Sequence, residues 1–198
     1  MPGRSLLLLL LTLPLSDQTG TLVIAGGGKL PDRVFQRFVE ASGGRNARIA
    51  ILPTASGDPR ESASAMVDRI KALGGQPVVL DPRTRPQAEA MALETVGCTG
   101  FWFTGGDQKR IQGIVAGTSL HRAIAEAYLK GAAVGGTSAG AAVMSRIMLE
   151  GQADVSETAP GSYKTLDGLG LLPGCIVDQH FIRRSRHNRL LSLLMEHP

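Results

Sequence analysis

Residues 136–140 read Gly-Thr-Ser-Ala-Gly and fit the pattern G-x-S-x-G. They follow an apolar run at 132–135, which is typical of a buried strand, and they open a predicted helix at 139–149. In this setting the pattern is typical of a nucleophile elbow, a tight turn that lifts one hydroxyl above a sheet. We therefore predict that Ser138 is a nucleophile and that the Ala139 N–H stabilises a developing oxyanion. The alternative is a Gly-rich turn that merely begins a helix.

A nucleophilic serine needs a base at neutral pH, and the chain has four histidines. His180 follows the apolar run at 176–177, so we expect it at the same sheet edge as Ser138. His187 lies among arginines, whose charge disfavours its protonated form. The other two are less suited, because one falls in a predicted surface helix and one is penultimate: His121 and His197. We predict His180 as the base, and the alternative is a hydrogen-bonded residue at a strand end.

The carboxylate that would orient this histidine is left open by the spacing alone. Asp154 and Glu157 lie between Ser138 and His180 along the chain, and Asp178 lies beside His180. Each of these three carboxylates is a candidate for the third member of a catalytic triad.

Residues 104–108 read Thr-Gly-Gly-Asp-Gln and follow the apolar run at 100–103. Adjacent glycines let backbone amides approach a substrate carbonyl closely, so we predict Gly106 as the second oxyanion donor. Gln108 would then contact the bound substrate. A helix N-terminus capped by Asp107 is a second interpretation, and it is compatible with the first.

Four arginines lie within seven residues: Arg183, Arg184, Arg186 and Arg189. The chain has 21 Lys+Arg against 17 Asp+Glu, a formal net charge of +4, so this cluster alone accounts for the positive excess. A local cluster gives no extended footprint for nucleic acid. Guanidinium groups bind carboxylates bidentately, so the cluster predicts an acidic peptide as ligand. Read as a helix from Arg183, it places several guanidinium groups on one side, and a solvated basic helix face is the alternative.

Short apolar runs closed by turn residues alternate with longer amphipathic stretches along the 198-residue chain. The runs predict strands buried on both faces at 21–25, 48–52, 77–80, 100–103 and 132–135, with a shorter one at 176–177. The stretches predict helices at 32–41, 61–73, 87–95, 108–115, 120–130 and 139–149. This alternation predicts one α/β domain over 21–198, with a mainly parallel sheet between two helical layers. Ligands of such folds bind at the carboxyl ends of the strands, where the motifs described above fall.

The amino terminus has a different composition from the rest. Arg4 precedes a leucine-rich run at 5–15, which has the length of a secretory h-region and is too short to span a bilayer. We interpret residues 1–20 as a signal peptide and expect export to the periplasm or the medium, without stable membrane insertion. No small-x-small pattern marks a cleavage site, and a leader that does not function would leave the protein in the cytoplasm.

The two cysteines, Cys98 and Cys175, both lie beside apolar runs and lack the spacing of a metal site. We expect both to be plain core residues, and we predict neither a metal nor a cofactor.

Together, these motifs resemble those of the cyanophycinases, in the serine-peptidase family that also holds the aspartyl dipeptidases. The resemblance runs from about residue 21 to the end of the chain and rests on residues 103–108, 136–140 and 178–190. The last segment reads D-Q-H-F-x-x-R-x-R-x-x-R-L and is the most specific of the three.

The resemblance implies a flavodoxin-like three-layer fold similar to the class I glutamine amidotransferases. It also implies hydrolysis of cyanophycin, a poly-aspartate whose β-carboxyls carry arginine, to β-Asp-Arg dipeptides, without a cofactor. It makes Ser138 the nucleophile, His180 the base and Glu157 the triad carboxylate. It assigns six residues to the substrate pocket: Gln108, Asp178, Gln179, Arg184, Arg186 and Arg189. For the oligomeric state, a homodimer is one expectation.

Two alternative functions stay open at this point. One is an aspartyl or isoaspartyl dipeptidase of the same family, and the other is a catalytically inactive protein that binds acidic peptides. Members of the family continue for several tens of residues past the final predicted helix. We therefore expect the domain at 21–198 to be incomplete at its C-terminus.

Overall fold

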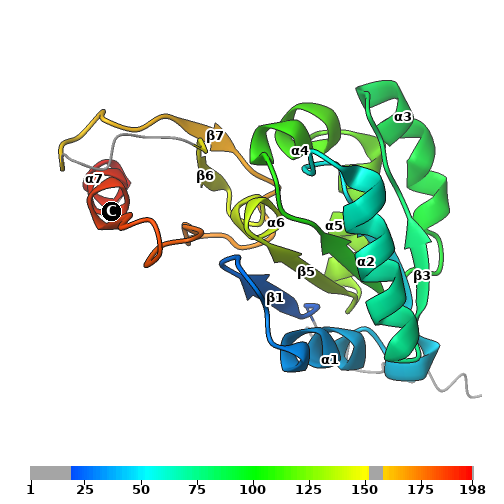
Figure 1. Ribbon diagram of the computed structural model, residues 1–198. Coiled ribbons are helices and arrows are strands. Elements are labelled where there is room, and N and C mark those ends of the chain that lie inside the picture. The colour runs from blue at the N-terminus through cyan, green and yellow to red at the C-terminus, as the bar shows by residue number, and fades with distance from the viewer. Residues whose placement is uncertain (1–18, 152–157, 198) are drawn as a thin grey trace, which may run out of the picture.

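A parallel sheet forms the centre of the molecule in the computed structural model, which describes residues 19–151 and 158–197 (Figure 1). Its five strands lie in the order β1-β5-β4-β2-β3, and all neighbouring pairs are parallel. Their bounds are Leu22–Ala25 for β1, Arg48–Leu52 for β2, Gln76–Val79 for β3, Gly100–Phe103 for β4 and Ala133–Thr137 for β5. Nearly all of the proposed signal peptide falls outside the described residues, as do Asp154 and Glu157.

Helices cover both faces of this sheet. One face packs against α1 (Asp32–Ala41) and α2 (Pro59–Ala72), and the other against α3 (Arg85–Ala90), α4 (Gln108–Val115), α5 (Ser119–Leu129) and α6 (Ala139–Ala142). Short 3-10 helices occupy Gly44–Asn46 and Met91–Thr95, so the helix predicted at 87–95 is split in two. Successive side chains of a strand point to opposite faces, and Phe101 and Phe103 accordingly enter one core while Trp102 enters the other. The predicted three-layer α/β fold is confirmed.

Close packing fixes β5 against β4. The Trp102 indole lies between the rings of Phe35 and Phe38, with centroid distances of 5.3 and 4.9 Å. A Cβ at Gly135, on the neighbouring strand, would lie 2.4 Å from the indole ring. Only glycine therefore lets the largest core side chain pack across the strand that leads into residues 136–140.

The helix predicted at 139–149 is wrong beyond its first turn. After α6 the chain turns into β6 (Ile147–Leu149), which pairs antiparallel with β7 (Thr165–Asp167). The carbonyls of Val143 and Met144 accept hydrogen bonds from Leu169 N at 2.6 Å and Leu172 N at 2.8 Å. These acceptors are the ones a longer helix would use, so a tertiary contact ends the helix.

The region after residue 172 also differs from the prediction. Residues 176–177 form no strand, because Val177 N donates to the side chain of Ser145 at 2.8 Å and not to a neighbouring strand. Bends occupy 179–180 and turns occupy 181–186, and α7 (His187–Glu196) begins only at the fourth residue after Arg183. Ser185 has a φ of +49°, which a helix does not accommodate, so the predicted helix from Arg183 is wrong.

The two cysteines also differ in their surroundings. Cys98 is buried as predicted, but Cys175 is exposed in a segment that forms no strand, so the prediction that it is a core residue is wrong. Strands β6 and β7 and helix α7 form an extension to one side of the sheet, where Leu149, Tyr163 and Leu193 make a small core of their own (Figure 1).

Across the described ranges, none of the helices has the length and apolar character to cross a membrane.

Candidate active site

Ser138 sits at the junction between β5 and α6 in a strained backbone conformation, with φ 53° and ψ −111°. The glycines on either side have no room for a side chain. A Cβ at Gly136 would lie 2.4 Å from the Gly140 carbonyl oxygen, and a Cβ at Gly140 would lie 2.2 Å from the Phe103 carbonyl oxygen. These contacts are the crowding that a nucleophile elbow relieves with glycine, and the turn has the geometry of that motif.

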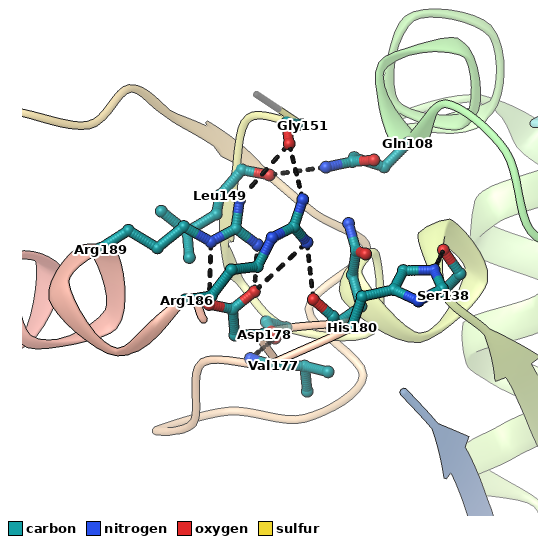
Figure 2. Close-up of polar contacts among 11 residues, drawn as sticks. Gln108, Ser138, Leu149, Gly151, Val177, Asp178, His180, Arg186 and Arg189 are labelled. Atoms are coloured by element: carbon teal, nitrogen blue, oxygen red, sulfur yellow. Dashed lines mark hydrogen bonds and ion pairs between the residues drawn. The ribbon is translucent and has the colours of Figure 1, made fainter. Parts of the chain in front are cut away.

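His180 lies against this serine. Its Nε2 is 3.0 Å from Ser138 Oγ, so a neutral imidazole accepts the serine proton in a hydrogen bond (Figure 2). The backbone of His180 is also unusual, with a φ of +52° and with its N–H donating to the Gly26 carbonyl at 2.7 Å. A serine hydroxyl and an imidazole at this distance are placed for nucleophilic attack with general-base assistance.

The surroundings of His180 favour its neutral form. Burial holds the pKa of the His180 imidazole below its ordinary value of 6.5, and the positive charges of Arg184, Arg186 and Arg183 lower it further. The arginines that were expected to disfavour the protonated form of His187 therefore disfavour that of His180. At neutral pH the imidazole is free to accept a proton, and imidazolium formation during a reaction needs a compensating carboxylate.

That carboxylate is absent from the described residues around the imidazole. Asp178 directs its carboxylate to Arg189 and Arg186. No other carboxylate of the described ranges hydrogen bonds to the ring of His180. Asp154 and Glu157 lie outside the described residues, so the assignment of Glu157 as the triad acid stays a prediction.

Gly27 is a site residue whose role the sequence reasoning missed. It follows β1 with a φ of +107°, and a Cβ there would lie 2.5 Å from Cε1 and 2.6 Å from Nε2 of His180. The imidazole thus rests directly on the backbone of residue 27. Three consecutive glycines at the end of a strand, Gly26 to Gly28, were the signal that pointed to such a close approach.

The two predicted oxyanion donors belong to the two segments that meet at the cavity over Ser138. Ala139 is the first residue of α6, and Gly106, with a φ of +142°, lines the same cavity as Ser138. Neither backbone N–H has a hydrogen-bond partner among the described residues. A Cβ at Gly106 would lie 2.0 Å from the Ala55 carbonyl oxygen, so this position requires glycine. Unpaired N–H groups beside a nucleophile are the donors an oxyanion needs, and their role stays a prediction.

A cavity of about 680 Å³ opens over Ser138. Of the predicted substrate-pocket residues, Gln108, Gln179 and Arg184 line it. Gln108 is buried and donates from Nε2 to the Leu149 carbonyl at 2.9 Å, whereas Oε1 of the buried Gln179 has no partner among the residues that the structure describes. Both signs of charge occur on the wall, from Asp107, Lys109, Glu150, Lys164 and Arg184.

The other three predicted pocket residues contact one another. Arg189 donates to both carboxylate oxygens of Asp178, from Nε at 2.9 Å and from Nη2 (Figure 2). Arg186 donates to the carbonyls of Gln179, at 2.6 Å, and Gly151, at 3.2 Å. The three side chains are 1 to 5% exposed and do not line the cavity over Ser138. Their contact with substrate stays a prediction.

A serine on a strand–helix elbow, hydrogen bonded to a histidine at the carboxyl edge of a parallel sheet, defines the centre of a serine hydrolase on an α/β fold. Residues 22–198 match Peptidase family S51, and the chain belongs to that family.

Curated relatives of the chain include the cyanophycinase of Geminocystis herdmanii (strain PCC 6308). It is 38% identical over 190 residues, which cover 91% of this chain and 69% of the relative. The cyanophycinase of Nostoc sp. (strain PCC 7120 / SAG 25.82 / UTEX 2576) is 35% identical, and the match covers 93% of this chain and 64% of the relative. The cyanophycinase of Synechococcus elongatus is 32% identical, and the match covers 92% of this chain and 59% of the relative. The chain thus spans 59 to 69% of the length of these relatives.

Solved structures share the fold. A peptidase from an acI-B1 Actinobacterium superposes with a TM-score of 0.70 at 20% identity, covering 90% of this chain and 76% of that one. A putative peptidase E protein from Listeria monocytogenes EGD-e gives a TM-score of 0.55 at 19% identity, with 77% and 75% covered. At these identities the likeness concerns the fold alone.

The contact between Gly27 and the imidazole predicts a specific defect. In Gly27→Ala the new methyl group displaces the His180 ring, so labelling of Ser138 by a fluorophosphonate probe should slow by about 10²-fold, as expected for a displacement near 1 Å. Gly28→Ala is the matched control, because φ is also positive, at +86°, but a Cβ would contact nothing within 4 Å. Both variants should lose stability on the order of 1–3 kcal/mol from backbone strain. Equal labelling rates in the two variants would contradict the assigned contact.

The surroundings of His180 predict the pH dependence of this labelling. The active form is the neutral imidazole, so the rate should fall as the pH drops through the His180 pKa, with a midpoint below 6.5. Arg184→Gln removes a positive charge that disfavours imidazolium, so the pKa rises and the midpoint moves to higher pH. Arg183→Gln should move it less, because Arg183 contributes less to the lowered pKa. A midpoint that does not move in Arg184→Gln would contradict this account.

Proposed function

We propose that the chain is a serine-type exopeptidase that hydrolyses cyanophycin to β-Asp-Arg dipeptides. The observation that carries the proposal is the hydrogen bond between Ser138 Oγ and His180 Nε2, which lies beneath a cavity able to hold a dipeptide unit. Membership of Peptidase family S51 and the printed names of the relatives, at 32 to 38% identity, support it.

The reaction begins at Ser138. Its Oγ attacks the carbonyl carbon of the peptide bond between two aspartates while the proton passes to His180 Nε2. The N–H groups of Ala139 and Gly106 donate to the tetrahedral oxyanion. The imidazolium then protonates the leaving amine as the C–N bond breaks, and an acyl ester remains on Ser138.

Water completes the cycle. The neutral imidazole takes a proton from a water molecule, whose oxygen attacks the ester carbonyl, and Ser138 recovers its proton as the C–O bond breaks. In this proposal Glu157 stabilises the imidazolium in both halves of the reaction. This stabilisation by a carboxylate is needed the more because the neighbouring arginines oppose a positive charge on His180.

The substrate carries free carboxylates and guanidinium groups, and the cavity wall carries both signs of charge. Within the described part of the chain, neither Arg184 nor Lys164 pairs with a carboxylate, so both are available to bind one from the substrate. Glu150 faces the same cavity, although Lys109 already lies 3.0 Å from it. In this proposal Oε1 of Gln179, which has no partner among the described residues, accepts a hydrogen bond from a substrate N–H group, and Gln108 lines the same cavity.

Clearing of insoluble cyanophycin by the purified protein tests this function. The wild type should release β-Asp-Arg, and Ser138→Ala should lose about 10⁶-fold in rate, as expected when a nucleophile is removed. Ser64→Ala, at an exposed serine of α2, is the matched control and should clear the polymer like the wild type. Equal clearing by the wild type and Ser138→Ala would overturn the proposal. Cleavage of soluble isoaspartyl dipeptides without clearing of the polymer would show a dipeptidase instead.

We also propose that residues 1–20 direct export, supported by Arg4 and the leucine-rich run at 5–15. Expression of the full chain in a bacterial host tests this proposal by mass spectrometry of the N-terminus. Export predicts a shortened protein in the periplasm, and a full-length protein confined to the cytoplasm would contradict it. A homodimer stays a prediction for which light scattering is the measurement.

A further inference from the structure

The two members of the Ser–His pair are held in different ways. Ser138 follows a strand in the middle of the sheet, and its N–H donates to the Ala25 carbonyl at 3.0 Å, so the sheet fixes it. His180 belongs to an irregular segment without strand pairing, anchored by its own N–H to Gly26 and by Val177 N to Ser145 Oγ. Apart from the hydrogen bond to Gly26, the position of the imidazole therefore depends on side-chain contacts of its segment.

The residues next to His180 enter a buried ionic cluster. Asp178 binds the guanidinium of Arg189 through both carboxylate oxygens, and Arg186 Nη1 lies 3.8 Å from the same carboxylate. Arg186 also donates to the Gln179 carbonyl, one residue before His180. The irregular segment is thus held through the side chain of one residue and the backbone of the next.

The same two arginines reach a third segment. Arg186 Nη2 and Arg189 Nη1 both donate to the carbonyl of Gly151, at 3.2 and 3.4 Å. Gly151 follows β6 and is the last described residue before 152–157. The cluster therefore joins the His180 segment, the start of α7 and the end of β6, as Figure 2 shows.

The charge of the cluster is unbalanced, with two guanidinium groups and one carboxylate, all 1 to 5% exposed. Burial first, and the charge of Arg189 second, lower the pKa of Arg186 to about 10, while Asp178 opposes the change. Arg186 is still protonated at neutral pH. A buried ion pair of this kind is weak support for stability, because desolvation offsets much of the attraction, so a local positioning role accounts for it better.

We propose that Asp178, Arg186 and Arg189 are positioning residues that hold His180 against Ser138. The inference rests on the proposed function for its chemistry. It differs from a ligand role in a measurable way, because a positioning residue affects the reactivity of Ser138 even when no substrate carboxylate or guanidinium is present.

A small fluorophosphonate probe separates the two roles. In the labelling reaction the Ser138 Oγ–P bond forms, the P–F bond breaks with loss of fluoride, and the serine proton passes to His180. The probe has neither a carboxylate nor a guanidinium group. Asp178→Asn should slow labelling by about 10²-fold, as expected for an imidazole displaced by about 1 Å. With cyanophycin, the loss should fall on kcat, with KM changed by less than about threefold.

Conservative and control variants complete the test. Arg189→Lys keeps one donor and the charge and should label faster than Arg189→Met. Arg122→Lys is the matched control, because this exposed arginine also donates to a backbone carbonyl, that of Gly117 at 3.0 Å, and it should label like the wild type. Thermal unfolding checks that each variant is folded, and should Asp178→Asn not fold, the Arg189 pair of variants carries the test.

Each outcome decides between the two roles. Wild-type labelling rates in Asp178→Asn and Arg189→Met, together with a raised KM for cyanophycin, would overturn the positioning role and support a ligand role. A wild-type chain that is not labelled contradicts the proposed function, and the ¹⁵N spectrum of the His180 imidazole then tests the cluster separately. The positioning role predicts that the Nε2 resonance moves in Asp178→Asn but not in Arg122→Lys, and an unmoved resonance would overturn it.

Discussion

The hydrogen bond between Ser138 Oγ and His180 Nε2 joins the end of a strand in the central sheet to a segment without regular secondary structure. Three glycines near the pair make room for this contact. Gly136 and Gly140 allow the turn that lifts the hydroxyl, and Gly27 leaves room for the ring. The serine is fixed by backbone pairing within a sheet, whereas the histidine has one backbone hydrogen bond, to Gly26, and its segment is otherwise held by side chains. The two kinds of support differ in how easily a substitution disturbs them, since a sheet distributes a perturbation over many hydrogen bonds.

Electrostatics around the pair favours the neutral form of the imidazole in the resting protein. Burial and three arginines keep the pKa of His180 below its ordinary value, so the imidazole is ready to accept the serine proton. The same arrangement makes imidazolium formation costly. A carboxylate close to the ring would lower this cost, but Asp178 is already engaged by Arg189. Because its carboxylate binds Arg189, Asp178 does not pair with His180, although it lies only two residues before it in the sequence.

The sheet could be predicted from sequence because each of its strands is a short apolar run closed by turn residues. Arg48–Leu52 and Gly100–Phe103 fall where the pattern placed them. Ser138 and His180 were expected at one sheet edge and do meet there, although the strand expected at 176–177 does not form and His180 is held by its hydrogen bond to Gly26 instead. The segment after α6 could not be predicted, because the carbonyls of Val143 and Met144 are used by residues distant in sequence. The arginines near His180 showed a charge pattern, but only the fold reveals that Arg186 and Arg189 are buried beside Asp178.

In the proposed mechanism, Ser138 Oγ forms a covalent acyl ester with the substrate. Mass spectrometry of the acid-quenched reaction tests this most directly. The substrate is a defined trimer of β-Asp-Arg units, and the diagnostic fragment is the tryptic peptide of residues 131–146, which contains Ser138. The account predicts an acyl ester on Ser138 in the wild type and an unmodified peptide in His180→Ala. An ester on any other residue, or turnover of the trimer with this peptide unmodified throughout, would contradict it.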